Sequence, residues 1–182
     1  MPAFRPLGER QLYRGKIIAL AVGRFAGPDG SEFERDIVRH PGAVSVVPVL
    51  DDGDRVLLVR QYRAAIDTEL LEIPAGTRDV EGEPPEITAR RELAEEVGMQ
   101  AGQLEELAQF FNAPGFSDER SWVYLARDLE PCGSSLQGIE EEHMTVEEMS
   151  LSDLTGLIAS GAITDAKTII GLSLARDALR RP

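Results

Sequence analysis

Three glutamates are crowded into the stretch RRELAEEVG, residues 90–98, and their spacing could serve a metal site. On a helix each residue turns about 100°, so Glu96 lies about 40° and Glu95 about 60° from Glu92. The three carboxylates therefore share one face, and the apolar residues of the segment fall on the other. Two carboxylates about 4 Å apart repel by about 4 kcal/mol at an effective dielectric constant near 20. A bound divalent cation would turn that repulsion into attraction.

The ligand chemistry favours a hard ion. Carboxylate oxygens select Mg²⁺ or Mn²⁺, and the two histidines, His40 and His143, are too far apart in sequence to form a paired zinc ligand. Arg91 lies one turn before Glu95, where an ion pair can hold the rotamer of that carboxylate. The alternative is an amphipathic surface helix whose acidic side chains are only hydrated, so the rest of the sequence must decide.

Three segments have helical patterns: residues 85–97, 151–160 and 164–180. The first begins at Pro84 and Pro85, where a helix tolerates proline. Either Ser150 or Ser152 is the expected N-cap of the second helix, and Thr164 that of the third. These helices would position the acidic face and cover a sheet.

Strand patterns are interspersed with the helices. The β-rich runs AVSVVPVL and RVLLVRQY are separated by DDGD, and LEEL and SWVYLAR are shorter candidates. Near the N-terminus, QLYRGKIIALAVGRF and SEFERDIVRH flank the turn signal AGPDG, which predicts a β-hairpin arm within residues 1–40. Residues 41–182 are then expected to form one α/β domain, with a mixed β-sheet packed between helices.

Composition excludes several classes of partner. The 182 residues carry a net charge of -13, which disfavours nonspecific attraction to nucleic acid or to an anionic membrane. The N-terminus lacks the apolar region of a signal peptide, and no apolar run approaches about 18 residues. We therefore expect a soluble, cytoplasmic protein. Cys132 is the single cysteine, so it cannot form an internal disulfide and is interpreted as an incidental loop thiol.

The longer stretch GTRDVEGEPPEITARRELAEEVGM resembles the Nudix box. The matching positions are Glu83, Arg91, Glu92, Leu93, Glu95, Glu96 and Gly98. One departure from the pattern is that six residues, rather than five, separate Gly76 from Glu83. The extra residue falls in the loop before the helix, where DVEG can absorb it, and some ADP-ribose pyrophosphatases, the mycobacterial type among them, have the same lengthening. The resemblance implies a Nudix-type α/β/α sandwich.

The resemblance also implies hydrolysis of a nucleoside diphosphate linked to another group, with metal ions bridging the diphosphate. Such chemistry needs charge neutralisation and an oriented water, which metals supply. Carried over by position, Glu92 and Glu96 are metal ligands, and Glu95 is a ligand or a water-mediated contact. Ala75 would contribute its backbone carbonyl as a further ligand. The resemblance assigns supporting roles to Glu83 and Arg91.

Further motifs are similar to the ADP-ribose pyrophosphatase branch of the family. LLEIPAG precedes the box and NAPGFSDE follows it. The marker of the branch is a proline sixteen residues beyond the last glycine of the box, and Pro114 stands there. By itself Pro114 could be only a turn residue. Its spacing from Gly98 makes it a substrate-binding candidate.

The same resemblance points to other substrate contacts. Arg63 and Arg35 are candidates to bind the diphosphate or its sugars, because a guanidinium can bind two phosphate oxygens at once. A rim salt bridge is the alternative for Arg35. Glu72 is expected near the metals or the ribose. Phe116 or Trp122 could stack on adenine, with core packing as the alternative for Trp122.

The acidic segment GIEEEHMTVEE could supply the catalytic base. In the resembled branch a mobile acidic loop provides one glutamate that deprotonates or orients water and often another that holds a metal. Glu140 and Glu142 align best with these roles, and Glu141 is an alternative. Glu140, Glu142 and Glu95 are therefore the catalytic candidates. A disordered acidic loop without a catalytic role is the competing interpretation.

ADP-ribose is the substrate that these features favour, with AMP and ribose 5-phosphate as products. A nucleoside triphosphate would bring more negative charge to an acidic protein, whereas ADP-ribose brings only its diphosphate. In the resembled branch, N-terminal arms exchange between protomers, so we expect a homodimer. Two alternatives remain: hydrolysis of another nucleotide sugar, NADH or coenzyme A, and a non-catalytic ADP-ribose sensor. The intact carboxylate set argues against the sensor.

Overall fold

Residues 3–133 and 143–181 are described by the computed structural model of this chain. Its internal contacts divide the chain into two units. Unit 1 comprises Met1–Gly42 and Phe111–Arg120, and unit 2 comprises Ala43–Phe110 and Ser121–Pro182. The acidic helix and the β-rich runs that follow the N-terminal segment belong to unit 2.

Unit 2 contains two sheets between helices. The four-stranded sheet has the order β7 (Ala75–Thr77), β4 (Ala43–Pro48), β9 (Arg120–Pro131) and β8 (Met99–Phe111). The three-stranded sheet has the order β10 (Thr145–Ser150), β5 (Arg55–Arg63) and β6 (Thr68–Glu72). The helices are α1 (Pro85–Val97), the short 3₁₀ helix η1 (Leu151–Asp153), α3 (Leu154–Ala159) and α4 (Ala166–Leu179). No helix in the described part of the chain has the length and apolar character needed to cross a bilayer.

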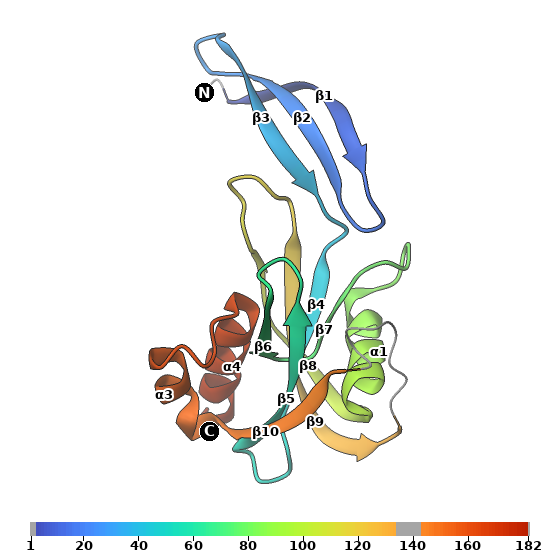
Figure 1. Cartoon of the computed structure of the whole chain (residues 1–182), viewed down its shortest axis with the longest axis vertical. Coiled ribbons are helices and arrows are strands. Elements are labelled where there is room, and N and C mark those ends of the chain that lie inside the picture. The colour runs from blue at the N-terminus through green and yellow to red at the C-terminus, as the bar shows by residue number, and fades with distance from the viewer. Residues whose placement is uncertain (1–2, 134–142, 182) are drawn as a thin grey trace. The chain divides into compact units, whose positions relative to one another are not determined.

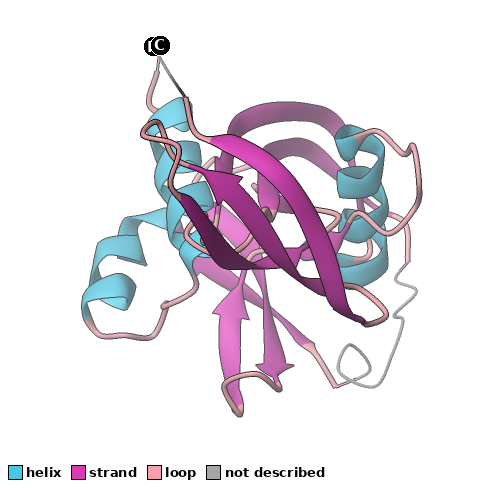
Figure 2. Cartoon of the chain, turned by 90° about the horizontal axis from the view of Figure 1, so that it is seen from above, coloured by secondary structure: helices cyan, strands magenta, loops and turns pink. Residues whose placement is uncertain are grey.

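Two core clusters lie on opposite faces of the strands, because successive side chains of a strand point to opposite sides. Val44 and Val46 of β4 belong to a cluster with Leu93 of α1. Val47 of the same strand belongs to the other cluster, with Leu172 of α4. Figures 1 and 2 show α1 on one side of the strands and α3 with α4 on the other. Since β4 runs parallel to β9 and antiparallel to β7, the α/β/α sandwich with a mixed sheet is confirmed.

The N-terminal part of unit 1 is a three-stranded antiparallel sheet, which we call the arm. Its strands are β1 (Arg5–Arg14), β2 (Ala19–Ala26) and β3 (Glu32–Arg39), in that order. A hairpin of two strands was predicted here. A third appears because a turn, closed by a 2.8 Å hydrogen bond from Gly15 N to Ile18 O, divides the run QLYRGKIIALAVGRF. The remaining segment of unit 1 joins the arm at Val38, whose N–H donates to Phe116 O at 2.8 Å.

The predicted helices are present, with one corrected cap. Helix α1 has the predicted limits, with Pro84 as N-cap and Pro85 as its first residue. Ser150 caps η1, since its side chain accepts from Ser152 N. The predicted Thr164 cap of the last helix is wrong: Asp165 is the N-cap, and its carboxylate accepts a 2.9 Å hydrogen bond from Thr168 N. Aspartate fills this position as well as threonine does.

The interpretation of GIEEEHMTVEE as one acidic loop was wrong for its last residues. From Thr145 the chain forms β10, which pairs antiparallel with β5. Two cross-strand ion pairs offset the negative charge of this strand: Arg60 Nε lies 2.6 Å from Glu147 Oε1, and Arg55 Nη1 lies 2.6 Å from Glu148 Oε2. The sequence analysis also did not identify strands β6, β7 and β10. The base candidates Glu140, Glu141 and Glu142 lie outside the described residues.

Candidate active site

Helix α1 buries two of its three clustered glutamates. Glu92 is 8% exposed and Glu96 is 4% exposed, whereas Glu95 is partly exposed. The helix ends at Gly98, whose φ of 65° lies in the left-handed region that glycine adopts most easily, and Gly98 N donates to Ala94 O at 3.1 Å. The last glycine of the box therefore has a structural role, while the buried carboxylates need partners.

The backbone of β7 supplies contacts for both buried carboxylates. Ala75 N donates a 2.9 Å hydrogen bond to Glu96 Oε2. A Cβ atom built on Gly76 would lie 2.0 Å from Glu92 Cδ and 2.2 Å from each of its carboxylate oxygens. Only a glycine at position 76 leaves room for the Glu92 carboxylate where it lies. Helix α1 and β7 thus hold Glu92 and Glu96 beside the residue expected to contribute a carbonyl oxygen.

Arg91 links the acidic residues of this face. Its Nη1 lies 2.9 Å from Glu92 Oε1 and 3.1 Å from Glu95 Oε2, and its Nη2 lies 3.5 Å from Glu83 Oε2. Glu83 also accepts a 2.7 Å hydrogen bond from Thr88 Oγ1. Burial lowers the pKa of Arg91, but the charges of Glu92, Glu95 and Glu83 outweigh it and raise that pKa. The ion pair between Arg91 and Glu95 predicted from their spacing is confirmed.

The carboxylate oxygens gathered here are the type of ligand that a hard divalent cation prefers. Glu92 and Glu96 place carboxylate oxygens on one helix face against β7, and Gly76 provides the space that one of them fills. Across residues 3–133 and 143–181, however, no three Asp, Glu, His or Cys side chains are grouped so that they could hold a metal ion. Arg91 pairs with Glu92 and Glu95, and the backbone N–H of Ala75 donates to Glu96.

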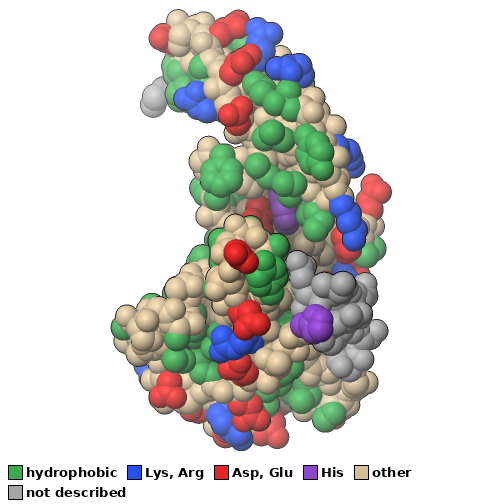
Figure 3. Space-filling model, viewed as in Figure 1, with side chains coloured by type: hydrophobic (Ala, Val, Ile, Leu, Met, Phe, Trp, Pro, Cys, Tyr) green, Lys and Arg blue, Asp and Glu red, His purple; other side chains and the backbone are tan. Residues whose placement is uncertain are grey.

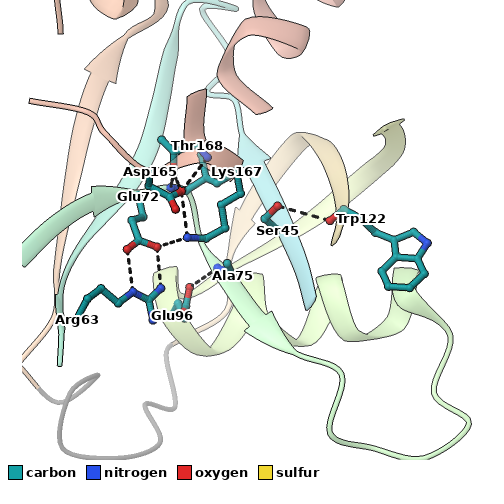
Figure 4. A network of polar contacts seen from close by, with 10 residues as sticks. Ser45, Arg63, Glu72, Ala75, Glu96, Trp122, Asp165, Lys167 and Thr168 are labelled. Atoms are coloured by element: carbon teal, nitrogen blue, oxygen red, sulfur yellow. Dashed lines mark hydrogen bonds and ion pairs between the residues drawn. The ribbon is translucent and has the colours of Figure 1, made fainter. Parts of the chain in front are cut away.

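The buried Glu72 forms an ion pair with the partly exposed Arg63 of the same unit (Figure 4). Arg63 Nε donates to Glu72 Oε1 at 2.8 Å and Arg63 Nη2 donates to Glu72 Oε2 at 2.7 Å. Lys167 Nζ also contacts Glu72 Oε2. Burial raises the pKa of Glu72, but the hydrogen bond from Arg63 and the charges of Lys167 and Arg63 outweigh it and lower that pKa. The charge of Glu96 acts on Arg63 as well, which connects this pair to the acidic helix.

The polar residues at the start of α4 were not among the predicted site residues. Lys167 Nζ lies 3.0 Å from Asp165 Oδ2, and Thr168 Oγ1 donates to the same carboxylate oxygen at 2.6 Å. Thr168 Oγ1 also accepts a 3.0 Å hydrogen bond from Ile73 N. The segment DAKT carried a signal, since aspartate is among the residues preferred at a helix N-cap. Its proximity to Glu72 comes only from the tertiary fold.

Three predicted substrate contacts belong to unit 1. Arg35 lies on β3, where its Nη1 donates to Glu34 O at 2.7 Å and its Cζ lies 4.7 Å from the centre of the Phe33 ring. Pro114 and Phe116 lie in the segment that hydrogen-bonds Val38 of the same strand. Phe116 is 59% exposed. Arg63 and Glu72, in contrast, belong to unit 2.

Trp122 packs against the core, as the alternative interpretation expected. It is partly buried and lies against the cluster that contains Leu93. The guanidinium carbon of Arg78 lies 4.7 Å from the centre of its ring. Phe116 is the more exposed of the two aromatic residues.

Comparison with known proteins gives consistent matches. Residues 39–170 match the NUDIX domain family. An ADP-ribose pyrophosphatase of Bacillus subtilis (strain 168) is 39% identical over 164 residues, which cover 90% of this chain and 88% of that protein. A methanol dehydrogenase activator of Bacillus methanolicus is 36% identical over 162 residues, covering 89% and 86%. The crystal structure of an ADP compounds hydrolase, 25% identical in sequence, superposes with a TM-score of 0.83 and covers 98% of this chain and 95% of its own.

Proposed function

Because the chain belongs to the Nudix family, whose hydrolases need divalent cations, we propose that it hydrolyses the diphosphate bond of ADP-ribose to AMP and ribose 5-phosphate. The observation that supports this most is the pair of buried carboxylates, Glu92 and Glu96, held against β7 in a chain 39% identical to an ADP-ribose pyrophosphatase. Buried carboxylates are costly unless they are paired or bind a cation. Their retention on one helix face is consistent with a metal site.

The metal is Mg²⁺ or Mn²⁺ in this proposal. Glu92 and Glu96 would hold it together with the backbone carbonyl of Ala75, and Glu95 would be a further ligand or a contact through water. When bound, the cation supplies charge neutralisation for the diphosphate and a more acidic water. Arg91 and Glu83 keep the carboxylates in place before the cation arrives, through the ion pairs described above.

Two sets of substrate contacts are proposed, each within one unit. Arg63 would donate to a phosphate oxygen, with Glu72 fixing its orientation, and a guanidinium suits this role because its donors are planar and always charged. Arg35, Pro114 and Phe116 would contact the rest of the substrate, with the exposed Phe116 ring available to stack on adenine. Glu140 or Glu142 would serve as the base that takes a proton from the attacking water. The assignments of the substrate contacts and of the base both come from the sequence resemblance.

The arm is proposed to form a homodimer. Large apolar side chains are exposed along it, namely Phe4, Leu12, Tyr13, Ile17 and Ile18, and Figure 3 shows hydrophobic side chains gathered on the visible face of this sheet. Apolar side chains gathered on an exposed surface often mark a protein–protein contact. Association with a second copy would cover this surface.

A substrate panel tests the proposed function. ADP-ribose, ADP-glucose, GDP-mannose, NADH, coenzyme A and ATP would be assayed side by side with Mg²⁺ or Mn²⁺, using a coupled phosphatase to release phosphate. We expect the highest kcat/KM for ADP-ribose, because kcat/KM records differential binding of the transition state. A kcat/KM at least about tenfold higher for another compound would show that ADP-ribose is not the preferred substrate. The assignment to the Nudix family would stand. No turnover with any of them would favour a role without catalysis, and the relative named methanol dehydrogenase activator makes this control necessary.

A further inference from the structure

Glu72 is a deeply buried carboxylate that contacts two cationic side chains. It is 1% exposed, and its oxygen Oε2 is shared by two cations, Arg63 and Lys167. An ionised carboxylate in such a place is stable only when its oxygens are well occupied. The two cations come from different elements, since Arg63 ends β5 and Lys167 lies in the first turn of α4.

The Arg63 guanidinium uses only part of its donor set on Glu72. Nε and Nη2 donate to the carboxylate, and no described residue is hydrogen-bonded to Nη1. The side chain of Arg63 is 37% exposed, so it can be reached by a ligand. Figure 4 shows this guanidinium close to both Glu72 and Glu96. Nη1 therefore keeps both of its N–H donors for a substrate oxygen.

Lysine is rare in this chain. Of the 19 basic residues, only Lys16 and Lys167 are lysines, which leaves 17 arginines. Lysine differs from arginine in presenting a compact point charge on a flexible stem. At position 167 that ammonium contacts Glu72 Oε2 and lies 3.0 Å from Asp165 Oδ2. Asp165 is in turn fixed as the N-cap of α4, because it accepts from Thr168 N. The ammonium is thus anchored at a defined point of the helix.

We propose that Lys167 is a positioning residue for substrate binding, acting through Glu72 on Arg63. It anchors Oε2 of the carboxylate, and the anchored carboxylate holds Arg63 by two nitrogens so that Nη1 faces the diphosphate. Lys167 itself does not touch the substrate. This inference rests on the proposed function, because it assigns the diphosphate of ADP-ribose as the partner of Arg63.

The test is a double-mutant cycle between Lys167 and Arg63 in the full chain. The variants are Lys167→Met, Arg63→Ala and the two combined, each assayed for kcat and KM with ADP-ribose. Lys167→Met should raise KM and lower kcat/KM by about tenfold. A tenfold change corresponds to a loss of about 1.4 kcal/mol in binding free energy. In the Arg63→Ala background the same change should alter kcat/KM by less than about twofold, because the residue through which Lys167 acts is gone.

Two further variants separate positioning from folding. Lys167→Arg keeps the charge and should recover most of the lost affinity. Lys167→Gln, which removes the charge but keeps a polar end, takes the place of Lys167→Met in the cycle if Lys167→Met does not fold. Lys16→Met is the matched control, since it removes the other lysine, an exposed residue of unit 1, and should leave kcat/KM unchanged. Additive losses in the cycle, or an unchanged KM for Lys167→Met, would overturn the inference. A parent enzyme with no activity on ADP-ribose would instead overturn the proposed function.

Discussion

The carboxylate of Glu92 occupies the space that a side chain at position 76 would need. A Cβ atom on Gly76 would lie 2.0 Å from Glu92 Cδ, far inside van der Waals contact. We expect Gly76→Ala to displace the flexible end of Glu92 rather than to unfold the protein. Activity should fall by about 10- to 100-fold, the cost typical of disturbing the support of a metal site, with a small change in Tm.

Gly156 provides the matched control for that substitution. It lies in α3, and a Cβ atom built there would meet nothing within 4 Å. Gly156→Ala should therefore keep full activity and raise the Tm slightly, because alanine has the higher helix propensity. Equal activity of Gly76→Ala and Gly156→Ala would mean that the position of the Glu92 carboxylate does not matter for turnover.

Replacing either buried glutamate by glutamine should remove metal-dependent turnover. Glu96→Gln keeps an oxygen that can accept from Ala75 N, so the fold is preserved while the charge is lost. The loss of activity should exceed the roughly 100-fold that a supporting group costs, and the same is expected of Glu92→Gln. Rates measured against Mg²⁺ concentration, with circular dichroism to confirm folding, check this. Parental activity of Glu96→Gln at saturating Mg²⁺ would reject the metal assignment.

Local patterns were sufficient to predict the acidic helix. Its period, its two prolines and its final glycine define α1 from Pro85 to Val97. The spacing of Arg91 and Glu95 also predicted their ion pair. These features depend on residues within one or two turns of each other, which is the range that helical geometry fixes.

Contacts between distant segments could not be predicted in this way. Lys167 reaches Glu72 across 95 positions of the chain, and nothing in either local segment specifies that meeting. Strand β10 was missed for a related reason: its negative charge is balanced by Arg60 and Arg55 of a strand far away in sequence. Charge patterns within TVEEMS alone favour a loop. Only the pairing of β10 with β5 explains why it is a strand.

Glu72 should make the free energy of unfolding depend on pH. Its pKa in the folded state lies below the ordinary value of 4.5, so on acidification the unfolded state takes up the proton first. Its contribution to stability is therefore full above about pH 4.5 and is lost as the pH falls through the lower folded pKa. Glu72→Gln should be less stable than the parent near neutral pH, but its Tm should change less between about pH 5.5 and about pH 3.5. Parallel Tm profiles of the two proteins would contradict this.

Either Glu140 or Glu142, in the acidic segment GIEEEHMTVEE, should act as the catalytic base. The corresponding glutamine variant should lose kcat by about 10² to 10⁴ while substrate affinity changes little, because a base acts on the chemical step. The other glutamate should be a metal ligand, so the activity of its glutamine variant should respond to added Mg²⁺. Near-parental kcat in both variants and in Glu141→Gln would place the base elsewhere in the chain.

The arm should hold the protein as a homodimer through its exposed apolar side chains. Light scattering of the full chain at micromolar concentration is expected to give about twice the chain mass of 19.9 kDa. Ile17→Glu should shift the mass toward the monomer, because burying an unpaired carboxylate in an apolar interface is costly. Ile66→Glu is the control: Ile66 is 57% exposed, against 51% for Ile17, but it belongs to unit 2. This variant should remain dimeric, since the same charge is placed outside the arm. A monomer mass for the parent chain would contradict the role of the arm, whereas equal dissociation by both variants would show that added charge, rather than the arm surface, controls assembly.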